Sequence, residues 1–299
     1  MRARPSLLGG PGRTNRPGRT KRKAVALAAV TAILLPIAAC GTSGGDPAVP
    51  RPDHIVVVVE ENRSYSSIIG NSEAPYINEL ARWGASLTNF TAITHPSQPN
   101  YLALFSGSTQ GVSDNSCPRT FTARNLASQL LQADLTFAGY SQSMPSVGFT
   151  GCNSGAYARR HNPWVNFSNV PASANLPWTS FPRNYADLPT VSFVIPDVEN
   201  DMHDGTVRQA DTWLRDNLGD YAHWAMTHNS LLVVTWDEDE DGDSKANQIP
   251  TVLVGEQVRP GAYAEPNNLY GLLRTFLDAY GLPRVGHAAE MDPIEIWRK

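Results

Sequence analysis

An unbroken run of apolar residues, Ile55-Val56-Val57-Val58-Val59, constrains the fold of this 299-residue chain more than any other segment. Valine and isoleucine favour extended backbone, so the run predicts a strand. A strand that is apolar at every position is covered on both faces, as in parallel sheets flanked by helices. The run therefore predicts an α/β protein with a central, mostly parallel sheet.

Further apolar runs of strand length alternate with helical patterns along the chain. The predicted strands are 87–93, 135–140, 191–195, 231–235 and 251–254. The predicted helices, with apolar residues three or four positions apart, are 76–83, 123–132, 207–218 and 270–280. Strands that alternate with helices indicate α/β architecture, and we expect a single domain from 53 to 299.

The first 39 residues differ from the rest of the chain. Eight basic side chains and no acid are found there, and a short apolar run at 24–39 ends in small residues, which predicts a signal peptide. The sequence Ile37-Ala38-Ala39-Cys40 resembles a bacterial lipobox, so we expect lipidation of Cys40 and a flexible tether at 40–52. An ordinary signal peptide with a chance cysteine is the alternative. Both predict export: the domain is held at the outer face of the cell membrane by its lipid anchor alone, or is secreted.

Charge and cysteine content limit the partners. Without residues 1–39, 16 basic and 28 acidic side chains remain, a formal charge of about −12. This charge argues against nucleic acid as a partner, and phosphate chemistry would need a local cation such as a metal. With Cys40 lipidated, only Cys117 and Cys152 remain, and we expect them to be bridged, because unpaired thiols are uncommon outside the cytoplasm. Two free buried thiols are the alternative. We expect a monomer.

Polar residues follow three of the predicted strands. Ligands of parallel sheets collect at the carboxyl ends of the strands, so these residues are candidates for a metal site, although each could instead serve a solvated turn. They are Glu61 and Asn62 after the first strand, Asp197 after 191–195, and Asp237 and Glu238 after 231–235.

Ser97 is the candidate nucleophile. It precedes an apolar stretch at 101–105 that can open a helix, and the N–H groups at a helix N-terminus favour anionic oxygen. Serine is unreactive at neutral pH unless a base or a cation stabilises its alkoxide. A metal that touches the hydroxyl oxygen would do so.

Several separated motifs, in this order, resemble those of the phosphoesterase family that contains bacterial acid phosphatases and phospholipases C, within the alkaline phosphatase superfamily. They are Glu61-Asn62-Arg63-Ser64, Pro96-Ser97-Gln98-Pro99-Asn100-Tyr101, Asn200-Asp201-Met202-His203-Asp204-Gly205 and Thr235-Trp236-Asp237-Glu238. The resemblance implies an alkaline-phosphatase-like sheet flanked by helices. It also implies hydrolysis of phosphomonoesters, phosphoinositides among them, through a phosphoserine intermediate.

The resemblance also implies roles for single residues. Ser97 attacks phosphorus, and Asn100 holds a phosphoryl oxygen. A divalent metal is held by Glu61, Asn62, Ser97, Asp237 and Glu238. Oxygen ligands without thiolate or imidazole favour magnesium, calcium or manganese over zinc.

The leaving alkoxide needs a proton, which histidine supplies most readily in mildly acidic conditions. His203, His161 and His95 are the candidates, and a structural hydrogen-bonded histidine is the alternative for each. We expect Asp197 on the substrate side of the site, where it would orient one of them. The segment 141–184, rich in Gly, Pro, Ser, Asn and aromatic residues, predicts an irregular cap that shapes substrate access.

Three other functions are consistent with parts of the sequence. The same nucleophile and metal could cleave phosphodiesters, as in the phospholipase C branch. Leu269 stands where relatives carry a histidine, which would fit a catalytically impaired, phosphate-binding envelope lipoprotein. Asp237, Asp239, Asp241 and Gly242 resemble half of a calcium-binding loop, but Gln248 occupies the twelfth position and a strand precedes it.

Overall fold

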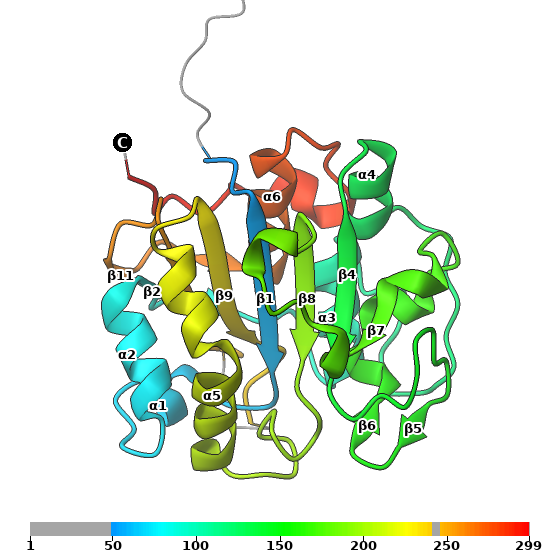
Figure 1. The fold of residues 1–299 in the computed structure, drawn as a ribbon, viewed down its shortest axis with the longest axis horizontal. Coiled ribbons are helices and arrows are strands. Elements are labelled where there is room, and N and C mark those ends of the chain that lie inside the picture. Colours follow the sequence, from blue (N-terminus) through cyan, green and yellow to red (C-terminus); the bar gives the residue numbers. More distant parts are fainter. Residues whose placement is uncertain (1–48, 241–245, 299) are drawn as a thin grey trace, which may run out of the picture. The chain divides into compact units, whose positions relative to one another are not determined.

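A sheet of eight strands lies at the centre of the described residues, 49–240 and 246–298, in the computed structural model (Figure 1). The expected signal peptide, Cys40 and most of the tether lie outside these residues, as do Asp241 and Gly242. The strand order is β11-β2-β10-β9-β1-β8-β4-β7. None of the described helices is long and apolar enough to cross a membrane.

The middle of the sheet is parallel. β1 (His54–Glu60) pairs in parallel with β8 (Val191–Ile195) on one side and with β9 (Ser230–Trp236) on the other. β4 (Phe137–Ser141) and β7 (Asn175–Pro177) extend the parallel part beyond β8. Beyond β9, antiparallel β10 (Thr251–Gly255) is followed by β2 (Ala85–Leu87) and β11 (Gly261–Tyr263). The predicted α/β fold with a mostly parallel sheet is confirmed.

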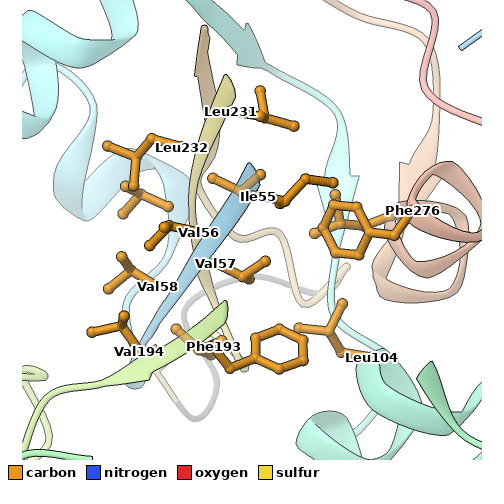
Figure 2. Close-up of a cluster of buried hydrophobic side chains, with 14 of the residues drawn as sticks. Ile55, Val56, Val57, Val58, Leu104, Phe193, Val194, Leu231, Leu232 and Phe276 are labelled. Carbon is orange, nitrogen blue, oxygen red and sulfur yellow. The ribbon is translucent and has the colours of Figure 1, made fainter. Parts of the chain in front are cut away.

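The apolar run predicted as a strand is the centre of the core. Ile55 to Glu60 are buried without interruption. Ile55 and Val57 point to one face of the sheet, toward Leu104 and Phe276, whereas Val56 and Val58 point to the other (Figure 2). Full burial of an aliphatic side chain contributes about 1.5–3 kcal/mol. Helices on both faces therefore stabilise the strand, as its sequence requires.

The helices form two layers. α1 (Tyr65–Ile68), α2 (Pro75–Trp83) and the long α5 (Val207–Ala225) belong to one layer, and α2 packs against α5 and β10. α3 (Ser97–Ser106) and α6 (Leu269–Ala279) pack together and supply Leu104 and Phe276 on the other face (Figure 2). α4 (Leu126–Gln132) contacts α3 and β4.

Three predicted elements differ from the structure by more than two residues at a boundary. The segment 87–93 is no single strand, because it divides into β2 and β3 (Phe90–Thr91), which pairs with β12 (Asn267–Asn268) in a separate small sheet. α5 continues to Ala225 instead of ending at 218. α4 starts at Leu126 instead of 123, because the Asn125 side chain accepts a hydrogen bond from the Ser128 N–H and caps the helix.

The cap, residues 141–184, is irregular as predicted except where it joins the main sheet through β7. It contains the hairpin of β5 (Asn153–Ser154) and β6 (Tyr157–Ala158), followed by short 3₁₀ turns. Trp164 of the cap packs on β4 at Gly139, where a Cβ atom would lie 2.1 Å from the indole ring. The expected disulfide between Cys117 and Cys152 is present, with the Cα atoms 5.8 Å apart.

Candidate active site

The ends of β1 and β9 bring four of the predicted residues together. Glu60 pairs with Trp236 in parallel register, so Glu61 and Asp237 follow at the same edge of the sheet. The Asp237 N–H donates to the Glu60 carbonyl at 3.1 Å, and the Asn62 N–H donates to Asp237 Oδ1 at 3.1 Å. Parallel pairing therefore gathers the acids that the sequence places after separate strands.

Ser97 is the first residue of α3 and is buried beside these acids. Its hydroxyl oxygen lies 2.9 Å from Glu238 Oε1 and 3.2 Å from Glu61 Oε2, and its single proton can be donated to either. The N-terminal N–H groups of α3 favour negative charge on oxygen here. The hydroxyl is thus held between two carboxylates that can accept its proton, at a helix N-terminus that favours negative charge on its oxygen.

Asn100 supports the loop before Ser97. Its side-chain oxygen accepts hydrogen bonds from the Ile93 and Thr94 N–H groups, at 2.9 and 3.0 Å, and its NH₂ donates to the Thr94 carbonyl at 2.7 Å. Both ends of the amide are therefore bonded to backbone. In this arrangement the amide braces the loop before Ser97, and the expected contact of Asn100 with a phosphoryl oxygen stays a prediction.

The acids around Ser97 have the properties of a cation site. Burial first, then repulsion from neighbouring acids, raises the pKa of Glu61 and of Asp237 well above the usual range. Asp237 Oδ2 is buried and accepts no hydrogen bond from the described residues. The Asn62 amide lies 3.3 Å from Glu61 Oε2 and 3.1 Å from Glu238 Oε1, where its NH₂ donates to both when no ion is bound; the amide turned over would place its oxygen beside theirs. A hard divalent cation fits this set of oxygens.

His161, from the cap, lies on the other side of Glu61. Its Nε2 is 3.1 Å from Glu61 Oε1, and its Nδ1 is 3.2 Å from Asp201 Oδ2. Tyr101 stacks on the imidazole at 5.3 Å and donates a hydrogen bond to the same Glu61 oxygen at 2.5 Å. Burial, and next the charge of Arg160, lowers the pKa of His161 well below its usual value, which favours a neutral imidazole.

His203 stands at the more open side of His161, with its ring centroid 5.8 Å away and its side chain 30% exposed. Its Nδ1 lies 2.7 Å from Asp204 Oδ1, and its Nε2 lies 3.1 Å from Arg160 Nη2. Glu61, His161 and His203 each offer a ligand atom within 4.8 Å of the others and form a group able to hold a metal ion. Two imidazoles would suit zinc better than magnesium or calcium.

His95 borders the site from the Ser97 side. Its Nδ1 lies 2.7 Å from Glu238 Oε2, and its Nε2 lies 3.3 Å from Asp239 Oδ1. All three candidate histidines thus contact or adjoin the buried carboxylates, but from two different sides.

Asp197 is placed differently from the expectation. Its carboxylate accepts hydrogen bonds from Ser143 at 2.5 Å and Asn200 at 3.0 Å, and it ties the end of β8 to the start of the cap. Asp201 is an acid that contacts His161 in its place, and it also accepts the His203 N–H at 2.8 Å. Sequence reasoning missed Asp201 and Tyr101. Both stand in the recognised motifs, and Tyr101 follows Ser97 by about one helical turn.

A buried serine held between carboxylates at the strand ends of this sheet is the arrangement of a phosphoric ester hydrolase with an alkaline-phosphatase-like fold. A structure titled as a protein of the alkaline phosphatase superfamily from Vibrio parahaemolyticus has the same fold, with a TM-score of 0.56 and 13% identity over 83% of this chain and 72% of that chain. Residues 71–283 match the model of the Phosphoesterase family, to which the chain belongs.

Two curated relatives support this membership. A phosphatidylinositol-3-phosphatase of Mycobacterium tuberculosis is 55% identical over 84% of this chain and 84% of its own length. A probable acid phosphatase of Kluyveromyces lactis is 29% identical over 80% of this chain and 61% of its own length. The family resemblance predicted from the motifs is confirmed, and with it the assignment as an enzyme of phosphoric ester hydrolysis.

Proposed function

We propose that the chain is an exported, metal-dependent phosphomonoesterase that works through a phosphoserine intermediate. The observation that supports this most is the contact of the Ser97 hydroxyl with Glu238 Oε1 at 2.9 Å and with Glu61 Oε2 at 3.2 Å. The hydroxyl proton leaves toward a carboxylate as the serine oxygen forms its bond to phosphorus and the ester oxygen departs. Water then cleaves the phosphoserine.

Glu61, Asn62, Asp237 and Glu238 would hold the metal together with Ser97. The bound ion would stabilise the serine alkoxide and the charge on the phosphoryl oxygens. Oxygen ligands favour magnesium, calcium or manganese. The chain's own task is to hold these acids buried and close together, and the bound ion would keep them deprotonated.

We assign the proton for the leaving group to His203. In phosphoryl transfer the attacking and leaving oxygens lie roughly in line, so the donor belongs on the side of phosphorus opposite Ser97. Ser97 contacts Glu61 Oε2, whereas His161 and His203 adjoin Glu61 Oε1. His161 is the poorer donor, because burial lowers its pKa. His95 lies on the Ser97 side, against Glu238.

Phosphomonoesters, with phosphoinositides among them, are the proposed substrates. The likeness to a phosphatidylinositol-3-phosphatase over most of both chains supports this choice. Export, with a lipid on Cys40, is supported by the N-terminal sequence pattern alone. Metabolic labelling with a radioactive fatty acid tests the anchor: label on the wild type and none on Cys40→Ala is expected, and an unlabelled wild type would remove it.

Phosphate release tests the reaction. Purified protein is assayed on p-nitrophenyl phosphate, bis-p-nitrophenyl phosphate and phosphatidylinositol 3-phosphate, with and without chelator. We expect faster turnover of monoesters, loss of activity with chelator and its return with a hard divalent cation. Ser97→Ala should lower kcat by at least about 10³-fold. Full activity of Ser97→Ala would refute the mechanism, and faster diester turnover would favour the phosphodiesterase alternative.

A further inference from the structure

The substrate must bring a phosphoryl dianion to a site that is rich in carboxyl groups. The described residues place five of them around Ser97 and His161: Glu61, Asp201, Asp237, Glu238 and Asp239. Like charges repel strongly where water is excluded. The proposed metal would offset this charge on the Ser97 side. The opposite side, lined by the cap, needs a positive group of its own.

Arg160 is suitably placed for this purpose. It belongs to a 3₁₀ turn of the cap (Arg159–His161) and is half-buried, with Nη2 3.1 Å from His203 Nε2. Its charge reaches the site: after burial, Arg160 is the next cause that lowers the pKa of His161, and it partly offsets the burial that raises the pKa of Asp201. Within 49–240 and 246–298, no carboxylate forms a salt bridge with Arg160. Most of its planar donor fork therefore remains available for an anion.

The adjacent arginine shows that this arrangement is specific. Arg159 is buried and donates hydrogen bonds to the Thr150 and Arg119 carbonyls, at 2.6 and 3.0 Å, and to Asn166 Oδ1 at 3.2 Å. It holds the cap together. The two consecutive arginines thus have different tasks, and only Arg160 adjoins the histidines of the site.

The group of Glu61, His161 and His203 offers a competing explanation, namely a second metal ion on this side. The contacts of His203 oppose it. Asp204 lies 2.7 Å from Nδ1, and Arg160 lies 3.1 Å from Nε2, so a guanidinium N–H uses the lone pair that a metal would need. A guanidinium at this distance also repels a divalent cation.

We propose that Arg160 is a substrate-binding residue that supplies the second positive charge of the site, and that the site holds a single metal ion. Arg160 leaves His203 when substrate arrives and donates two parallel hydrogen bonds to phosphoryl oxygens. The Nε2 of His203, freed by this movement, takes up a proton from solvent and then faces the leaving oxygen, to which it donates that proton. The inference rests on the proposed function, because it assumes the metal on the Ser97 side.

Binding of inorganic phosphate tests the proposal without turnover. Phosphate affinity is measured by calorimetry in the metal-loaded Ser97→Ala background, with Arg160 intact or changed to Gln or Lys. Arg160→Gln should weaken phosphate binding on the order of 10- to 100-fold, and Arg160→Lys by less, because it keeps the charge but not the fork. Arg183→Gln, at an exposed position of the cap, is the matched control and should have no effect.

Two further readouts use the protein with Ser97 intact. Elemental analysis should find one metal ion per chain, with and without Arg160. Arg160→Gln should raise KM for p-nitrophenyl phosphate, and added guanidinium should recover part of the loss in Arg160→Ala. Unchanged phosphate affinity in folded Arg160→Gln, or two metal ions per chain in the wild type, would overturn the proposal. Full activity of Ser97→Ala would instead refute the proposed function, and the phosphate affinities would still decide the role of Arg160.

Discussion

At the scale of single residues, Glu61 connects the two halves of the site. Its Oε2 faces the Ser97 hydroxyl, and its Oε1 accepts a hydrogen bond from Tyr101 and faces His161. Asp201 holds the far side of the same imidazole. One buried carboxylate therefore orients groups from α3, the cap and the end of β1, and small displacements on either side would reach the nucleophile.

The assignment of His203 as proton donor predicts a dependence on the leaving group. p-Nitrophenolate departs without a proton, whereas an alkoxide needs one. His203→Gln should lower kcat/KM for an alkyl phosphate by about 10²- to 10⁴-fold and change it far less for p-nitrophenyl phosphate. Initial rates on both esters, with His95→Gln as the matched variant, give the measurement. An equal loss on both esters, or the selective loss in His95→Gln, would contradict the assignment.

The sequence predicted the carboxylates of the site better than the residues that surround them. Glu61 and Asp237 follow apolar runs, and parallel pairing alone brings them together. The contacts of Asp201, Tyr101 and Arg160 depend on where the cap places His161 and where the loop after β8 places His203, which no periodicity encodes. The hydrogen bonds of Asn100 could not be predicted for a related reason, because its amide bonds to backbone groups that come close only in the folded loop.

At the scale of elements, the cap supplies Arg160 and His161 to the site, so its attachment bears on catalysis. Trp164 packs on β4 at Gly139 and donates a hydrogen bond to Asn175 of β7 at 2.8 Å. The sequence did not predict β7, because a three-residue strand that contains a proline shows no alternation of apolar and polar residues. The sequence did predict the long strands and helices, because their apolar residues recur over enough positions to show a pattern.

The disulfide provides a second attachment, and its removal gives a prediction. Cys152 precedes the hairpin that leads to His161, and its carbonyl accepts the Arg159 N–H at 2.9 Å. Cys117 lies two residues after Asn115, whose side chain accepts the Gln98 N–H at 2.9 Å beside Ser97. Both segments that the disulfide joins therefore reach the site.

Changing both cysteines to serine should lower the free energy of unfolding by about 2–4 kcal/mol. It should also lower kcat under conditions where the protein is still folded, because the Asn115 and cap contacts loosen. Urea unfolding and p-nitrophenyl phosphate kinetics measure the two effects. Reductant should have the same effect on the wild type and none on the double variant. Unchanged kcat in the folded double variant would restrict the disulfide to a role in stability.

At the scale of the whole molecule, the buried acidic side chains couple folding to metal binding. Glu60 is fully buried, and neither of its carboxylate oxygens has a hydrogen-bond partner among the described residues. Burial, then repulsion from Asp201 and Asp211, raises its pKa well above the usual range. With Glu61 and Asp237, whose pKa values are raised as well, the folded state holds protons that the unfolded chain has released.

These shifts predict opposite effects of pH on the metal-free and metal-bound protein. A carboxyl group with a raised pKa binds more protons folded than unfolded, so its contribution favours folding at low pH and is lost progressively above the unfolded value of about 4. Metal-free protein, prepared with chelator, should therefore unfold at a lower temperature at pH 8 than at pH 5. Metal replaces the protons and should raise Tm more at pH 8.

Thermal melts at both pH values, with chelator or excess calcium, measure these two trends. Asp237→Asn should weaken both trends because it removes one of the carboxylates. An equal gain from metal at both pH values would mean that the ion binds away from the buried acids, and the proposed oxygen site would have to be abandoned.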